Sequence, residues 1–250
     1  MIVLATTLIL ACADEGLIDP ARYGKLLFED EFSGPALGPA WKHFKSASTI
    51  RDGVFVGIEP PDAGHNSVNS LDIPALGDII VDLSFKFEGA KRFGVAFNDK
   101  TYKGSHAGHI CRVTFDPEGF TYQDDRDGIF KNEIYEKKQN GGKLDAAAQE
   151  SLKDKSLKVK KAFEPGKWYA ISVRIQGDLM QVLVDGAPQD PFRSTGLAHA
   201  GKRQVALVTS GKEVHVDHLK IRTTPWASHG PAPCIIISES LATGGNHEQI

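Results

Sequence analysis

The chain has 250 residues, of which 41% are hydrophobic and 24% are charged, and its formal net charge is −3 at pH 7. A chain of this length can bury a substantial core as one all-β domain or as two small domains. The small negative charge gives no global reason to expect nucleic-acid binding, so a nucleic acid is not an expected partner.

The first residues indicate the compartment. Residues 2–11 (IVLATTLILA) are apolar and are followed by Cys12. The run is too short to span a membrane as a helix, and it resembles the hydrophobic region of a secretory signal. Residues 9–12 (ILAC) also resemble a bacterial lipobox, in which the cysteine becomes the lipidated first residue. We therefore expect residues 1–24 to be a signal and tether, and the protein to be exported as a bacterial periplasmic or cell-surface lipoprotein anchored at Cys12. The alternative is a buried N-terminal strand.

The next part of the chain alternates between apolar and polar residues, as half-buried β-strands do. Residues 26–32 predict a first strand, and the dipeptide at 52–53 (Asp-Gly) predicts a hairpin turn. The clearest alternation spans residues 78–125, which predict four consecutive strands with one polar face. Their other face is apolar and is expected to be buried: Ile79, Val81, Leu83, Phe85, Phe87, Phe93, Val95, Phe97, Cys111, Val113 and Phe115. Cys111 is therefore expected to be a buried thiol, and a disulfide with Cys234 is the alternative.

A Lys-rich segment interrupts the strand pattern. Residues 130–161 contain nine lysines and the helix-favouring run LDAAAQESL, so we expect a helical insertion broken at residues 141–142 (Gly-Gly). Strands resume after it, at residues 168–175, 179–184, 204–209 and 213–222. About a dozen short strands with frequent turns indicate one β-sandwich domain at residues 25–225, followed by a tail at 226–250.

Four motifs in a fixed order carry a family resemblance. They are LLFEDEFSG near the start, IRDGVFVG, PGKWYAISVRIQGDLMQVLVDG, and GKEVHVDHLKI near the end. Together they resemble concanavalin A-like jelly rolls, and most closely a bacterial family of 3-keto-disaccharide hydrolases that is related to family 16 glycoside hydrolases. The resemblance covers roughly residues 25–222. It implies an all-β jelly-roll sandwich of two antiparallel sheets with one Lys-rich helical insertion, an exported protein, and a concave face that binds sugar.

The sequence departs from this family at the catalytic positions. Family 16 enzymes carry two glutamates in the pattern Glu-x-Asp-x-x-Glu, and this pattern does not occur here. The 3-keto-disaccharide hydrolases usually have a glutamate in the strand that corresponds to residues 109–115, which read HICRVTF in this chain. Whether the protein is a hydrolase-like or lyase-like enzyme therefore stays open at the level of the sequence.

The polar face of the central strands predicts a sugar-binding cleft. Arg92, Asn98, Arg112, Gln123 and Asp125 point to one side if the alternation holds. The Gly-containing loop at residues 99–108 adds further polar side chains and an aromatic ring that can stack on a sugar. Arginine and amide groups suit sugar hydroxyls or a carboxylate. The predicted substrate-binding residues are Arg92, Asn98, Tyr102, Lys103, Arg112, Gln123 and Asp124. The alternative is an ordinary solvated sheet face.

The same cleft suggests acid–base chemistry. Glycoside hydrolysis normally needs two carboxyl groups, and the carboxylates close to the cleft are Asp124, Asp125 and Asp127. A different scheme uses His106 or His109 as a base on an oxidised sugar, whose proton next to the carbonyl is acidic, with Arg92 or Lys103 stabilising the anion. The predicted catalytic residues are His106, His109 and Asp125. We thus expect a protein that acts on glycosides, including oxidised or anionic ones. The alternative is a non-catalytic carbohydrate-binding module or a structural surface protein.

The resemblance also implies a structural Ca²⁺ where the first and last strands meet. Glu31 and Asp217 match the positions of its ligands, and Gly53 offers a carbonyl oxygen. Ordinary acidity at a sheet edge is the alternative. No organic cofactor is expected, and the nine histidines do not form a zinc pattern. The Lys-rich insertion either forms a basic wall that attracts an anionic polysaccharide or presents a solvated helix face.

Overall fold

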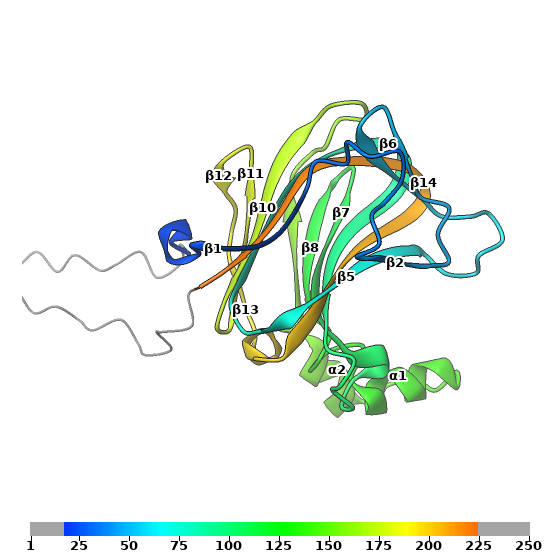
Figure 1. Ribbon diagram of the computed structural model, residues 1–250. Helices are drawn as coiled ribbons and strands as arrows, with labels where there is room; N and C mark the ends of the chain where they lie inside the picture. The colour runs from blue at the N-terminus through cyan, green and yellow to red at the C-terminus, as the bar shows by residue number, and fades with distance from the viewer. Residues whose placement is uncertain (1–17, 225–250) are drawn as a thin grey trace, which may run out of the picture.

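The computed structural model describes residues 18–224 (Figure 1). The predicted signal, the lipid anchor at Cys12, Cys234 and the C-terminal tail lie outside these residues. Within the described range the fold is all-β, with fourteen strands joined in antiparallel pairs and two α-helices. The predicted fold class is thereby confirmed. No helix of the described part is long and apolar enough to cross a membrane.

Two long strands organise the fold. β6 (Ile79–Asn98) and β14 (Lys202–Thr223) pair with each other along most of their length. Each bends at a glycine with positive φ, Gly89 (φ 99°) in β6 and Gly211 (φ 88°) in β14, a conformation that glycine adopts without strain. The register shifts at the same point, so the ladder continues through the bend. The two halves of each strand therefore join different neighbours, and one continuous sheet makes two layers. In Figure 1, β14 curves through the whole domain.

The layer that we call the cleft layer contains seven strands. In spatial order these are β2 (Trp41–Phe44), β5 (Ser67–Leu76), the first half of β14, the second half of β6, β7 (His109–Asp116), β8 (Gly119–Asp124) and β9 (Ser156–Lys160). The back layer contains the other halves of β6 and β14 with β1 (Lys25–Asp30), β3 (Thr49–Arg51), β4 (Val54–Ile58), β10 (Tyr169–Gln176), β11 (Leu179–Val184), β12 (Ala187–Pro188) and β13 (Phe192–Arg193).

The core lies between the layers and consists of the apolar faces that the alternation predicts. All eleven of the predicted inward residues of strands β6 and β7 are buried. Phe85 is surrounded by Phe93, Phe115 and Phe163, with ring centroids 5.2–5.4 Å apart. Each such ring contributes about 2 kcal/mol by leaving water. Cys111 is a buried free thiol of this core, as predicted.

The structure differs from the predicted elements in the central strands and in the insertion. The four strands expected in residues 78–125 are three, because the first two are the halves of β6. The insertion contains the expected helices α1 (Asn132–Gln139) and α2 (Ala146–Leu152), but its last part is strand β9, which pairs with β8. Its lysines alternate with Leu157 and Val159, and the lysine-rich composition hides that strand signal.

The last part of the predicted tether is docked on the domain. Ile18 and Tyr23 are 1% and 2% exposed and pack with Ile80 and Leu179. The Tyr23 hydroxyl also donates a hydrogen bond to the carbonyl of Ile175, at 2.8 Å. Residues 18–24 are thus part of the folded body, because two apolar side chains in an otherwise polar segment find a buried site.

Candidate functional site

A cleft of about 410 Å³ opens on the outer face of the cleft layer. Its floor consists of outward-facing residues that alternate with the core residues of the same strands. Small side chains occupy the centre, namely Gly94, Ala96 and Thr114, so the floor is low there. Arg92, Arg112 and Gln123 rise beside this floor, and Phe130 forms an apolar wall. The structure therefore brings three of the predicted binding residues into one cleft.

The floor of the cleft follows one row of the strand register. Within the cleft the row runs through Val208, Gly94, Thr114, Thr121 and Lys158. Beyond the cleft lining the same row continues to Val68 of β5 and Phe44 of β2. Adjacent strands are about 4.8 Å apart, so the row is roughly 29 Å long. A ligand on this floor would lie across the strands, with an exposed phenylalanine at one end and lysines at the other.

Arg112 is the most constrained cation of the cleft. Its Nε donates to Oδ2 of Asp125 at 2.5 Å, and its guanidinium carbon lies 4.6 Å from the centre of the Phe130 ring. Asp125 is completely buried, and burial raises the pKa of its carboxyl group although Arg112 opposes that rise. Among the described residues, Arg112 Nη2 and Asp125 Oδ1 have no hydrogen-bond partner. Asp125 thus positions Arg112 from below and is screened from the cleft.

Asp116 is a carboxylate of the cleft that the sequence analysis did not single out. It lines the cleft next to Arg92, one residue beyond the Phe93–Phe115 pair of β6 and β7. One of its oxygens accepts a hydrogen bond from the backbone of Glu118 at 2.9 Å, and the other lies 3.8 Å from Nζ of Lys158. The strand alternation that indicated Arg112 would also have indicated Asp116.

A chain of hydrogen bonds fixes the tautomer of His109. Gln204 Nε2 donates to Asp72 at 3.0 Å, Asn98 Nδ2 donates to Gln204 at 3.2 Å, and Asn98 Oδ1 faces His109 Nδ1 at 2.8 Å. The amide oxygen of Asn98 can only accept, so Nδ1 of His109 carries a proton and Nε2 carries the lone pair. Burial lowers the pKa of His109 to about 3, with smaller contributions from nearby positive charges. His109 is therefore a neutral imidazole.

The predicted loop residues form a second hollow beside the cleft. It has a volume of about 430 Å³ and is lined by Tyr102, Lys103 and His106, among others. The ring of His106 stacks on Tyr135 of α1, with centroids 3.8 Å apart and planes at 14°. His109 and Phe130 are in edge contact at 4.6 Å, next to His106. The structure thus separates the predicted site into the cleft and this adjacent hollow, and the predicted residues Asn98 and His109 line neither of them.

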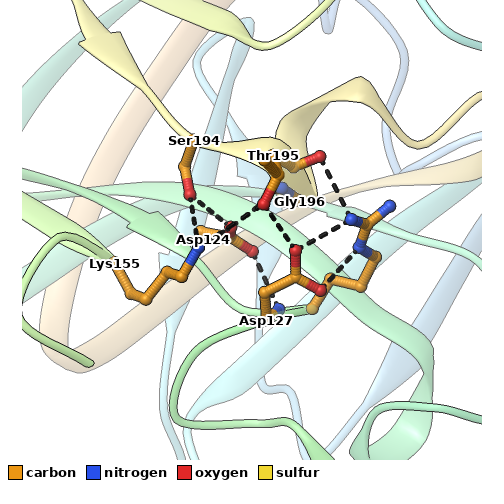
Figure 2. A network of polar contacts seen from close by, with 7 residues as sticks. Asp124, Asp127, Lys155, Ser194, Thr195 and Gly196 are labelled. Carbon is orange, nitrogen blue, oxygen red and sulfur yellow. Dashed lines mark hydrogen bonds and ion pairs between the residues drawn. The ribbon is translucent and has the colours of Figure 1, made fainter. Parts of the chain in front are cut away.

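Asp124 lies on the opposite side of the sheet from the cleft. It is paired with the core residue Cys111, so its side chain points inward, where it is buried. Its carboxylate accepts hydrogen bonds from Ser194 Oγ at 2.5 Å, from the backbone of Gly196 at 2.9 Å and from that of Asp127 at 3.0 Å. Figure 2 shows Lys155 reaching the same network, 3.6 Å from the carboxylate. Asp124 therefore anchors the 194–198 loop, and the structure keeps it away from the predicted ligand.

The predicted metal ligands lie where the first and last strands meet. Donor atoms of Glu31, Asp217 and His218 are all within 4.8 Å of one another, next to the β1–β14 pairing. Gly53 turns the adjacent β3–β4 hairpin with φ 76°. Two carboxylates suit the preference of Ca²⁺ for oxygen ligands. Lys220 Nζ lies 3.7 Å and His218 Nε2 lies 3.6 Å from the Glu31 carboxylate, so both side chains compete with a metal for this carboxylate.

The fold is a jelly-roll β-sandwich, and the family that the chain matches is a carbohydrate-active one. The family model of the 3-keto-alpha-glucoside-1,2-lyase-like domain matches residues 26–222, and the chain belongs to this family. The resemblance seen in the sequence is confirmed. No curated protein matches the chain.

Solved structures with the same fold support the architecture. A non-specific endo-β-1,3(4)-glucanase of glycoside hydrolase family 16 superposes with a TM-score of 0.56 and 11% identity, over 84% of this chain and 94% of that one. A GlcNAcα1-4Gal-releasing endo-β-galactosidase from Clostridium perfringens superposes with a TM-score of 0.51 and 11% identity, over 84% of this chain and 65% of that one. A sialidase superposes with a TM-score of 0.55 and 12% identity, over 78% of this chain but only 18% of its own length. At these identities the likeness concerns the fold.

Proposed function

We propose that the protein acts on glycosides that bind in the cleft, and that the sugar is an oxidised one with a carbonyl group in the ring. The observation that carries this proposal is the convergence of Arg92, Arg112 and Gln123 on a low floor beside the Phe130 ring. Guanidinium and amide groups bind sugar oxygens in pairs, and an aromatic face covers the apolar face of a sugar ring.

The name of the family suggests the reaction, which is elimination across C1 and C2 of a 3-keto-α-glucoside. The ketone at C3 makes the proton on C2 acidic. A base takes this proton, the C2–H electron pair forms an enolate, and the enolate expels the C1 oxygen, which takes up a proton as it leaves. Negative charge develops on the C3 oxygen, where Arg92 and Arg112 would stabilise it.

His109 is our candidate for the base. Its Nε2 carries the lone pair because the Asn98 contact holds the proton on Nδ1, and its ring contacts Phe130, which lines the cleft. In the free protein its pKa is about 3, which makes it a weak base. Negative charge that develops on a bound sugar would raise this pKa, because the protonated imidazole then gains a partner. Asp125 would act by holding Arg112, and His106 would border the site from the adjacent hollow.

A second function is binding without turnover. The specific observation in its favour is that the cleft lining has a single carboxylate, Asp116, and no histidine among the described residues. The paired glutamates of family 16 enzymes are also missing from the sequence. A surface module that holds a glycan needs no more than the cleft described above.

A chromogenic 3-keto-α-glucoside separates these functions. Release of the aglycone is followed by absorbance, and binding is followed by calorimetry with the same compound. We expect release by the wild type, a loss of about 100-fold or more in Arg112→Ala and His109→Gln, and no change in Arg51→Ala, which alters an ion pair of the back layer. Binding without release would establish the second function. Neither binding nor release would overturn the assignment of the cleft.

We also propose that the protein is exported and lipid-anchored at Cys12, on the sequence pattern described above. Metabolic labelling with a radioactive fatty acid tests the anchor, with Cys12→Ser as the control. A label that persists in Cys12→Ser would overturn it. The structural Ca²⁺ at Glu31, Asp217 and Gly53 is likewise a proposal, supported by the two converging carboxylates.

A further inference from the structure

A further hollow, of about 300 Å³ and distinct from the one at His106, adjoins the cleft at its β9 end. It is lined by Glu118, Lys158, Lys160, Lys161 and Ala162, and we call it the lysine hollow. Lys158 lines both the cleft and the lysine hollow, so the two are contiguous. A ligand longer than one sugar could therefore pass from the low floor of the cleft into this hollow.

The register fixes the direction of these lysines. Lys158 is opposite Thr121 of β8 and Lys160 is opposite Gly119, whereas Val159 is opposite the core residue Phe120. Val159 packs against the core, so its two lysine neighbours must point to the face that carries the cleft. The orientation follows from the strand itself and does not depend on a mobile side chain.

The charge of this region is strongly one-sided. Five cationic side chains line the cleft and the lysine hollow (Arg92, Arg112, Lys158, Lys160 and Lys161), against the carboxylates of Asp116 and Glu118 in the lining and the buried Asp125 that pairs with Arg112. The chain as a whole is slightly negative. Lys158 is 54% exposed and 3.8 Å from Asp116, and within the described residues neither Lys160 nor Lys161 has a carboxylate within 4 Å. These ammonium groups are therefore available to an external anion.

We propose that the lysine hollow binds a carboxylate or sulfate group of a glycan whose neighbouring sugar occupies the cleft. The inference rests on the proposed function in one respect, namely that the cleft takes a sugar. Lysine is a compact point charge that suits such groups without demanding a fixed geometry. The proposed site therefore predicts the substrate class: an anionic oligosaccharide or polysaccharide that lies across strands β6 to β9.

A purely structural role for the lysines makes a different prediction. β9 pairs only with β8, so it is an edge strand, and lysines on edge strands prevent pairing with other molecules. That role requires no ligand. Removal of the lysines would then cause aggregation, which light scattering detects, and would leave the affinity of the monomer for glycans unchanged.

The test compares two triple variants that remove the same charge. Lys158→Gln/Lys160→Gln/Lys161→Gln changes the lysine hollow, and Lys138→Gln/Lys143→Gln/Lys153→Gln changes the helical insertion. The probes are hexamers of galacturonate, their carboxyl-reduced counterparts, and sulfated and neutral dextran oligosaccharides, with affinity measured by calorimetry at low and high salt. We expect the first variant to bind the acidic probes on the order of tenfold more weakly than the wild type does. The affinity of the second variant should stay within about twofold of the wild-type affinity. The carboxyl-reduced and neutral probes should not distinguish the variants.

Three results would overturn the proposal. The first is an equal loss of affinity for the acidic probes in both triple variants, which would indicate an effect of net charge alone. The second is a wild type that does not prefer the acidic probes. The third is an unchanged affinity in the first variant. Failure of the proposed function is separate, because it is read from the 3-keto-α-glucoside with Arg112→Ala. A wild type that binds that compound but shows no acidic preference would refute the lysine hollow and leave the cleft intact.

Discussion

The substitution Asp124→Ala tests the network in Figure 2. The carboxylate is buried and accepts three hydrogen bonds, two of them from backbone N–H groups of Gly196 and Asp127. A hydrogen bond to a charged group contributes about 1.5–3 kcal/mol, and the donors left behind are partly buried. We therefore expect the free energy of unfolding to fall by about 4 kcal/mol. For a domain of this size, that corresponds to a decrease in Tm of about 10 °C.

Urea denaturation followed by tryptophan fluorescence measures this loss directly. Glu136→Gln, an exposed change on α1, is the control and should stay within about 0.5 kcal/mol of the wild type. The free energy of unfolding of Asp124→Asn should lie between those of Asp124→Ala and Glu136→Gln, because the amide keeps one hydrogen-bond acceptor and loses the charge. A loss below about 1 kcal/mol in Asp124→Ala would refute the reasoning, since the buried donors would then have found other partners.

A double-mutant cycle with Gly196 sharpens the test. A Cβ atom at Gly196 would lie 1.8 Å from Oδ1 of Asp124, which is far inside contact distance. Gly196→Ala should therefore lower the free energy of unfolding of the wild type. In the Asp124→Ala background the same substitution should lower it much less. An interaction energy of about 1–3 kcal/mol is expected for such neighbours. Additive effects would mean that the loop is held by something other than Asp124.

Three further predictions concern other sites. Burial holds the pKa of His109 at about 3, below the 6.5 of the unfolded chain, so the unfolded state binds more protons between these values. The stability that the neutral His109 contributes should be fully present above pH 6.5 and should be lost as the pH falls toward 3, by about 5 kcal/mol at most. Stability curves of the wild type and His109→Gln that stay parallel from pH 7 to 4 would contradict this. Burial raises the pKa of Cys111 to about 12, so in a Cys12→Ser/Cys234→Ser background a thiol reagent should label it only after unfolding; rapid labelling of the native protein would refute this. Calcium should raise the Tm of the wild type and EDTA should lower it, and Asp217→Asn should abolish the difference between the two conditions. A wild-type Tm that is the same with calcium and with EDTA would count against the metal.

The core was predictable from the sequence because burial and strand period act together. Residues such as Val81, Phe85 and Val95 were placed inward by alternation alone, and they are buried. The bends at Gly89 and Gly211 were not predictable in this way. A glycine flanked by strands is the usual signal of a turn, and only the long-range pairing of β6 with β14 turns it into a bend.

The cleft was predictable only in part, for the same physical reason. Arg92, Arg112 and Gln123 follow the alternation, and they line the cleft. Neighbouring residues of a strand must point to opposite faces, so Asp124 and Gln123 could not both reach the ligand. Phe130 was missed because it lies in a loop between β8 and α1. Its position against Arg112 is set by tertiary packing, and the only local signal is an apolar pair in a polar segment.

The pairing of β6 with β14 also has a consequence for the order in which the protein is made. The central floor of the cleft needs the pairing of Gly94 in β6 with Val208 in β14, and the same strand pair joins Asn98 to Gln204, 106 residues away in the sequence. A chain is synthesised from its N-terminus, and pairings between distant segments are the slow ones. The residues that we propose to bind the sugar are therefore synthesised long before the strand that completes the cleft. A nascent or truncated chain that ends before residue 202 would carry Arg92, Arg112 and Gln123 but no complete binding surface, so ligand binding can report that the last strand has been put in place.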